Sequence, residues 1–188
     1  SVKQEIFEYT DKVLTYVCDV SDETRVNEVV ALVCKEYGQI DILVNNAALW
    51  RSFSSFNQTD IEVWKKFIDV NIMGTVYFTK AVIDKMIKNN YGRIINVASI
   101  AGVYGNANMS HYSATKGAVI SFTKALAKEV ADKGITVNAV SPGSVSPSEN
   151  SNMDYSQNSE LCFMGRTGTA MENAELICFL ASDKAGYI

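Results

Sequence analysis

The sequence predicts an α/β fold built on a parallel sheet, because short runs of β-prone apolar residues alternate with longer segments of helical pattern. Four runs have the near-continuous apolar character of strands that are covered on both faces. The segments between them are long enough to hold the helices that connect parallel strands. We predict these strands at Val13–Val20, Ile40–Val44, Arg93–Ala98 and Ile135–Val140.

Capping signals predict where the first helices begin. Ser21 can cap a helix whose first turn is acidic and which Gly38 ends. Thr59 and Glu62 have the spacing of a capping box and predict the start of the next helix.

Helical periodicity recurs three more times further along the chain, and two of these segments end at a glycine. Residues 144–169 are rich in Ser and Asn and are predicted to form a long loop. The three helices are predicted at Asn71–Lys88, closed by Gly92, at His111–Lys133, closed by Gly134, and at Met171–Ser182.

Composition excludes several classes of function. The chain has 188 residues, is 47% apolar and carries a formal net charge of −4, which suits a single globular domain. It has no run rich in Lys or Arg, so we expect no nucleic-acid partner. No apolar segment approaches the roughly 20 residues needed to span a bilayer, so we expect no membrane role. The charged first residues lack the core of a signal peptide, which favours a cytoplasmic protein.

The cysteines do not predict a metal site. Cys18, Cys34, Cys162 and Cys178 share no CxxC spacing, and His111 is the only histidine. We therefore expect no metal, and we expect reduced cysteines in the core of a cytosolic protein.

Polar residues follow the predicted strands at the points where the strands end. They are Asp19, Asn45–Asn46, Ser99 and Ser141–Gly143. Each of them alone is a common first residue of a loop. Because parallel strands end at one edge of the sheet, where ligands bind in open α/β folds, their coincidence predicts a ligand site there.

Tyr112 and Lys116 provide a sharper signal. Residues four apart lie on the same face of a helix, so the phenol and the ammonium group can share one site. An ordinary tyrosine titrates near pH 10, and a neighbouring cation stabilises the phenolate. The pair could act as a general acid and base, although a YxxxK pattern alone also occurs by chance.

Several motifs together make the sequence resemble the short-chain dehydrogenase/reductase family. Tyr112 and Lys116 match its YxxxK motif, and Ser99, in RIINVAS, lies 13 residues before the tyrosine, as the active-site serine of the family does. Asn45–Ala48 reads NNAA where the family has NNAG, and Asp19, Asn71 and Ser141–Gly143 also match. The resemblance runs from about Val13 to Ile188 and is strongest to 3-oxoacyl-carrier-protein reductases and their sugar-alcohol relatives.

The resemblance implies a doubly wound, Rossmann-like parallel sheet and a hydride-transfer enzyme that uses NAD or NADP. It implies that Tyr112 gives or takes the proton of the substrate oxygen, and that Lys116 lowers the pKa of Tyr112 and binds the nicotinamide ribose. By the same resemblance, Ser99 polarises the substrate oxygen and Asn71 holds a water that relays protons through Lys116.

The resemblance also implies which residues contact the cofactor. Asp19 and Val20 would meet the adenine, and Asn46 and Ala47 would line a ribose. The residues expected to cover the nicotinamide are Pro142, Gly143 and Val145.

The sequence departs from the family where the dinucleotide pyrophosphate would bind. It contains no TGxxxGxG turn, and it starts where the family would be entering its third strand. We therefore expect residues 1–188 to be a single domain of this family without its first two strands and its last strand, and to be part of a longer polypeptide. The alternative is a truncated, non-catalytic relative that serves as an oligomerisation or interaction module.

The substrate and the assembly are predicted only by class. The resemblance implies a small carbonyl or secondary-alcohol substrate, whose contacts we expect from Leu49–Ser55, Ile100–Met109 and Ser148–Gly165. The helices at 71–88 and 111–133 are apolar on more than one face, through residues such as Val119 and Phe122, which favours a homodimer or homotetramer. We expect His111 to lie at the surface or to pack against a loop.

Overall fold

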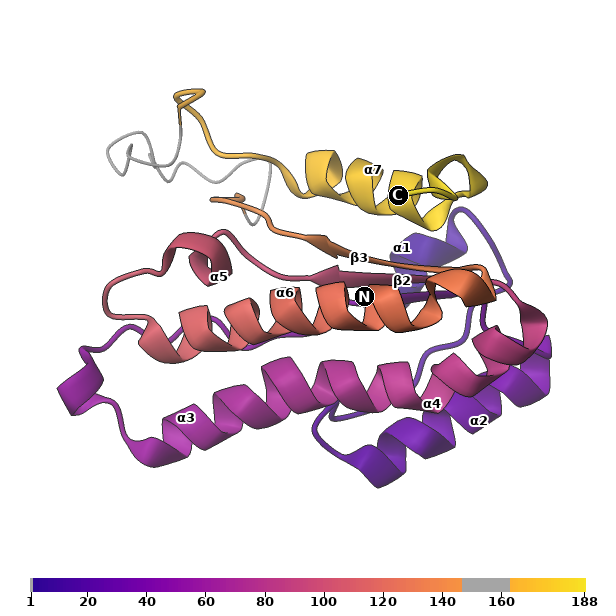
Figure 1. Cartoon of the computed structure of the whole chain (residues 1–188), viewed down its shortest axis with the longest axis horizontal. Helices are drawn as coiled ribbons and strands as arrows, with labels where there is room; N and C mark the ends of the chain where they lie inside the picture. The colour runs from indigo at the N-terminus through magenta and orange to yellow at the C-terminus, as the bar shows by residue number, and fades with distance from the viewer. Residues whose placement is uncertain (1, 147–162) are drawn as a thin grey trace.

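The computed structural model describes residues 2–146 and 163–188, and within them it contains a parallel sheet of three strands in the order β1-β2-β3 (Figure 1). The strands are β1 (Ile42–Asn45), β2 (Gly92–Val97) and β3 (Ile135–Val140). The α/β class and the three later predicted strands are confirmed, and β3 has the predicted bounds. β2 lies in the middle, paired in parallel with β1 and with β3.

Helices cover both faces of the sheet. The long helices α4 (Gly74–Asn89) and α6 (Ser110–Val130) lie on one face, and α2 (Glu23–Tyr37) packs against α4 outside them (Figure 1). Helix α7 (Ala170–Ala181) covers the other face. Successive residues of β2 serve the two sides: Ile94 belongs to the core under α4 and α6, and Ile95 to the core under α7.

The remaining elements are short. Helix α3, the turn η2 and α4 follow one another without a break, and η2 is a π-helical turn, in which the helix is locally widened. The short elements are α1 (Val2–Phe7), η1 (Phe56–Gln58), α3 (Ile61–Ile68), η2 (Asp69–Met73), α5 (Ala101–Tyr104), η3 (Ala131–Lys133) and η5 (Asp183–Ala185).

The predicted strand at Val13–Val20 is wrong, because this segment pairs with no strand in the described part of the chain. An extended backbone becomes a sheet strand only when a neighbour takes its N–H and C=O groups. Val17 in this segment is 92% exposed. Val20, at its end, packs closely on Gly74 of α4. The sheet therefore begins at β1, where Ile42 and Val44 are exposed.

Several helix ends differ from the sequence prediction. Asp22, not Ser21, caps α2 through its side chain, since Ser21 bonds to Asp19 instead. The predicted capping box of Thr59 and Glu62 does not form, because the Thr59 hydroxyl donates to the Ser55 carbonyl. Helix α4 ends at Asn90 in the left-handed conformation, while Gly92 lies in β2.

In the described ranges, no helix combines the length and the apolar character needed to cross a membrane. The same ranges contain no cluster of three His, Cys, Asp or Glu side chains that could hold a metal ion.

We predict that Gly134, in the turn between η3 and β3, is sensitive to substitution. Its φ is +68°, and a Cβ at this position would lie 2.3 Å from the Asn90 carbonyl oxygen. We expect Gly134→Ala to lower the free energy of unfolding by about 3 kcal/mol or more in urea titrations, from left-handed strain and a backbone clash.

Gly165→Ala is the matched control. Gly165 also has a positive φ, +69°, but no atom lies within 4 Å of the added Cβ. It should cost only the backbone strain, about 1 kcal/mol. Equal losses in the two variants would contradict the proposed clash.

Candidate active site

Ser99 lies at the carboxyl edge of the sheet, just after β2. The Ala98 N–H donates to the Val140 carbonyl at 2.8 Å, and the Ile100 N–H donates to the Pro142 carbonyl at 3.1 Å. These bonds continue the pairing of β2 with β3 past the ends of the strands. Ser99 is thereby held beside Pro142, and only 9% of its surface is exposed.

Gly102 brings the segment after Ser99 against α6. A Cβ at Gly102 would lie 2.5 Å from the Lys116 carbonyl carbon and 2.6 Å from the Gly117 nitrogen. Real Cβ atoms do not approach backbone this closely, so only glycine permits the contact between α5 and α6. The contact places Ser99 next to the first turns of α6.

Tyr112 and Lys116 occupy those first turns. The Ser99 side chain lies close enough to the Tyr112 phenol to lower its pKa, and the Lys116 Nζ lies 5.9 Å from the centroid of the Tyr112 ring. Lys116 is 4% exposed, and its Nζ donates to the Val97 carbonyl oxygen at 2.6 Å. The structure thus brings Ser99, Tyr112 and Lys116 together, as the sequence predicted.

Burial dominates the ionisation of this cluster. Burial raises the pKa of Tyr112, and the hydrogen bond from Ser99 opposes that rise. Burial lowers the pKa of Lys116 to about 8. Burial thus outweighs the lowering of the Tyr112 pKa that the resemblance implies for Lys116, and that role of Lys116 stays a prediction.

Asn71 joins the cluster through its side chain. It is 1% exposed, its Oδ1 accepts from the Leu49 N–H at 2.7 Å, and its Nδ2 donates to the Leu49 carbonyl at 3.0 Å. Its Nδ2 also donates to the Thr115 Oγ1 at 3.1 Å, and the Thr115 hydroxyl donates to the Tyr112 carbonyl at 2.8 Å. Asn71 therefore ties the loop after β1 to the backbone of Tyr112.

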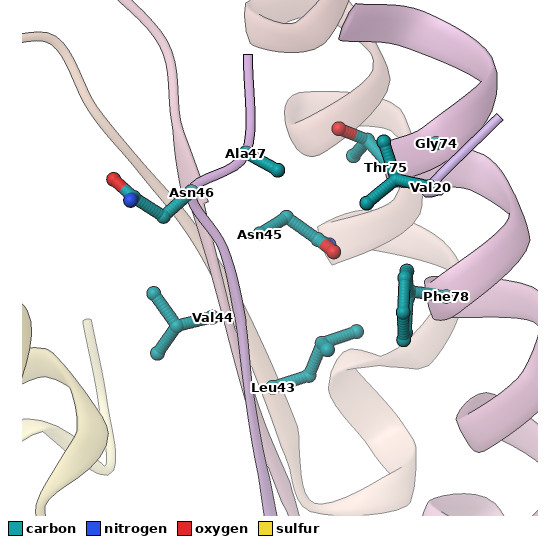
Figure 2. Close-up of a pocket in the computed structure, with 9 residues that line it drawn as sticks. All are labelled: Val20, Leu43, Val44, Asn45, Asn46, Ala47, Gly74, Thr75 and Phe78. Atoms are coloured by element: carbon teal, nitrogen blue, oxygen red, sulfur yellow. The ribbon is translucent and has the colours of Figure 1, made fainter. Parts of the chain in front are cut away.

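A pocket of about 200 Å³ lies beside the end of β1, and three of the expected cofactor residues line it. Figure 2 shows Leu43 and Asn45 on the side of β1 that faces α4, with Val44 and Asn46 on the opposite side. The lining residues are Val20, Leu43, Val44, Asn45, Asn46, Ala47, Gly74, Thr75 and Phe78.

The other expected cofactor residues lie outside this pocket. Asp19 is exposed, and its carboxylate accepts hydrogen bonds from the N–H and the hydroxyl of Ser21, which lower its pKa. Pro142 and Gly143 follow β3 next to Ile100, and Val145 forms an isolated bridge with Gly168. The expected residues thus share the carboxyl edge of the sheet but not one cavity.

A second groove, of about 350 Å³, lies between the loop at 48–52 and α3. The expected substrate contacts at Leu49–Ser52 line it, together with Lys66 and Phe67. Of the expected loop at Ser148–Gly165, residues 148–162 lie outside the described ranges.

The sequence-based reasoning missed Thr115 and misplaced His111. Thr115 is a single hydroxyl inside a helix and belongs to no motif; its only signal is its position one turn after His111 and three residues after Tyr112. His111 is fully buried, not at the surface, because the first turn of α6 packs against aromatic rings of α3.

Comparisons with known proteins match most of the chain. The family model described as short chain dehydrogenase matches residues 1–158. The 3-oxoacyl-(acyl-carrier-protein) reductase FabG of Thermotoga maritima is 40% identical over 180 residues, which are 94% of this chain and 73% of that protein. FabG of Escherichia coli is 38% identical over 173 residues, which are 90% of this chain and 70% of that protein.

Solved structures agree with the sequence relatives. The structure described as "ElxO with NADP Bound" has a TM-score of 0.90 at 34% identity, and covers 100% of this chain and 78% of that one. An NAD+-bound xylitol dehydrogenase has a TM-score of 0.81 at 32% identity, and covers 92% of this chain and 74% of that one. With this fold, this polar cluster and these relatives, the chain belongs to the short-chain dehydrogenase family.

Proposed function

We propose that the protein transfers a hydride between NAD or NADP and a carbonyl or secondary-alcohol substrate, with Tyr112 as general acid and base. The observation that carries the proposal is the cluster in which the Ser99 side chain lies close to the Tyr112 phenol and Lys116 lies one helical turn away. Relatives with bound NADP or NAD+ support the choice of cofactor.

The donors of the cluster fit the nicotinamide-ribose half of such a cofactor. An ammonium group has three N–H donors, and the Lys116 Nζ has one acceptor in the described ranges, the Val97 carbonyl. The remaining donors can bind ribose hydroxyls, and the segment at Pro142–Val145 can cover the nicotinamide. Asp19, Val20, Asn46 and Ala47 would hold the adenosine half, while no TGxxxGxG turn is present in this sequence to hold the pyrophosphate.

When bound, the dinucleotide supplies or accepts the hydride at the substrate carbon. In the reducing direction the Tyr112 hydroxyl donates its proton to the carbonyl oxygen, and the Ser99 hydroxyl donates a hydrogen bond to the same oxygen. The carbon gains the hydride and the oxygen gains the proton, so the product is an alcohol and Tyr112 is left as a phenolate. In the oxidising direction the phenolate takes the proton from the alcohol.

The pKa directions favour Tyr112 as a proton donor in this state of the chain. Burial raises the pKa of Tyr112, so the phenol is protonated at neutral pH. The pKa of Lys116 is about 8, so its ammonium form prevails at neutral pH and can stabilise the phenolate after proton transfer. The protonated phenol is the form that the reducing direction requires of the proton donor.

Asn71 is proposed to act in two ways. Its side-chain amide is engaged by Leu49 and Thr115, so it positions the loop after β1 and the helix that carries Tyr112. The relay water that the family resemblance implies would then bind its backbone carbonyl, which also accepts a hydrogen bond from the Thr75 hydroxyl.

We also propose a homodimer or homotetramer in the cytoplasm. Of the apolar residues of α6, Val119 is buried in the core, whereas Phe122 and Leu126 are only partly covered and Ala125 is exposed. Free thiols at Cys18, Cys34 and Cys178 suit a reducing compartment, and Cys162 lies outside the described residues.

Tyr112→Phe tests the proposed acid. The variant keeps the ring but cannot give or take a proton, so turnover should fall by roughly 10²–10⁴-fold while nucleotide binding is retained. Turnover is measured from nicotinamide absorbance with a 3-oxoacyl thioester and a sugar alcohol as trial substrates, and binding from NADH and NADPH fluorescence.

Tyr37→Phe is the control, since Tyr37 is 47% exposed at the end of α2, outside the segments expected to contact substrate or cofactor, and should leave turnover unchanged. Equal turnover in wild type and Tyr112→Phe would refute the role of Tyr112. A wild-type chain that binds neither nucleotide would instead favour the interaction-module alternative.

Lys116→Met tests the burial of the ammonium group. A lysine whose pKa is about 8 when folded and 10.5 when unfolded binds fewer protons in the folded state above pH 8. The wild type should therefore gain stability relative to Lys116→Met as the pH rises from 8 towards 10, by up to about 3 kcal/mol. The measurement is urea unfolding at stepped pH, and a flat difference between the two proteins over that interval would contradict it.

A further inference from the structure

His111 is the one histidine of the chain, and it lies in an unusual place for a polar side chain. It is 0% exposed, and neither ring nitrogen has a hydrogen-bond partner in the described part of the chain. Its ring instead meets Phe67 edge to face, with centroids 4.4 Å apart and planes at 85°, and Trp64 at 6.0 Å and 70°. The imidazole is therefore used as an aromatic ring and not as a hydrogen-bonding group.

This contact has a second beside it, also between α6 and the rod formed by α3 and η2. His111 and Thr115 are one turn apart on α6, and Phe67 and Asn71 are one turn apart on the rod. His111 meets Phe67, and Thr115 meets Asn71 through a hydrogen bond of 3.1 Å. Tyr112 lies in the same helical turn as His111, directly after it.

The first turn of α6 needs such a support. Its N-cap residue, Met109, makes no side-chain capping bond, and helix ends without a cap fray easily. The His111 ring packs edge to face against two aromatic rings of α3, a contact that can restrain this turn where a side-chain cap is missing. Tyr112 lies in this turn, so the place of its phenol near Ser99 depends on the turn.

We propose that His111 is a positioning residue, whose ring, clamped by Phe67 and Trp64, fixes the first turn of α6 and so holds Tyr112 toward Ser99. The inference rests on the proposed function only for its kinetic test. The placement of Tyr112 can be measured without turnover.

The kinetic test compares His111→Ala, His111→Phe and Val119→Ala with the wild type. Val119 is 3% exposed on the same helix, two turns further on, and serves as the matched loss of packing. His111→Ala should lower kcat by about tenfold or more with KM nearly unchanged, because small displacements of a reacting group cost rate. His111→Phe keeps a ring in the clamp and should restore kcat to near the wild-type value.

Two kinetic outcomes would overturn the proposal. The first is a loss of kcat in Val119→Ala as large as that in His111→Ala at a temperature where both are folded, which would make the effect one of general packing. The second is a loss in His111→Phe as large as in His111→Ala, which would assign the effect to the ring nitrogens.

The second readout is carbon-13 NMR of protein labelled at the phenol carbon of tyrosine, with the Tyr112 signal identified by its loss in Tyr112→Phe. Because burial raises the pKa of Tyr112, His111→Ala should lower its titration midpoint, while His111→Phe and Val119→Ala leave it unchanged. An unchanged midpoint in His111→Ala overturns the positioning role.

If His111→Ala does not fold, Phe67→Leu, which removes the facing ring, is judged by the same midpoint. A wild type without turnover contradicts the proposed function alone, since this readout still decides the role of His111.

Discussion

The pairing of β2 with both of its neighbours is the interaction on which the site depends. Beyond the strand itself, the N–H groups of Ala98 and Ile100 continue the ladder to the carbonyls of Val140 and Pro142. Side chains extend it sideways: the Asn45 amide donates to Asn96, and the Asn96 amide donates to Thr123 of α6. Buried polar groups that are fully paired in this way are costly to rearrange. The position of Ser99 is therefore fixed by hydrogen bonds that continue the sheet, although Ser99 lies beyond the end of β2.

Much of the fold could be predicted from the sequence, and the exceptions have a common cause. Ile135–Val140 was predicted with its observed bounds because its apolar pattern and the Gly134 turn are local signals. Val13–Val20 has the same pattern but forms no strand, because pairing requires a partner that the pattern does not specify. The predicted capping roles of Ser21 and Thr59 are wrong for a similar reason. Ser21 and Thr59 have suitable side chains, but Asp19 and Ser55 offer them nearer partners.

The residues of the site also fall into those that the sequence identifies and those that only the structure shows. Tyr112, Lys116 and Ser99 could be found because helix geometry and a family spacing relate them. Thr115 and His111 could not, since their roles arise only when α6 meets the rod of α3 and η2. The pKa directions also required the structure: a cation near a phenol suggests a lowered pKa, and the burial of both groups reverses that expectation for Tyr112. Sequence spacing identifies Tyr112 and Lys116 as a pair, and their burial in the folded protein decides the direction in which each pKa shifts.

The π-helical turn at Asp69–Met73 has a consequence for how this region can vary. A π turn corresponds to an α-helix that has gained one residue, and it shifts the faces of the helix on its two sides relative to each other. Here it lies between Phe67, which faces α6, and Thr75, which bonds back to Asn71. Removal of a single residue between Phe67 and Asn71 would rotate Asn71 away from Leu49, whereas a substitution there would leave the number of residues, and so this angle, unchanged. The length of this segment, counted in residues, is thus as strongly constrained as the identity of any side chain in it.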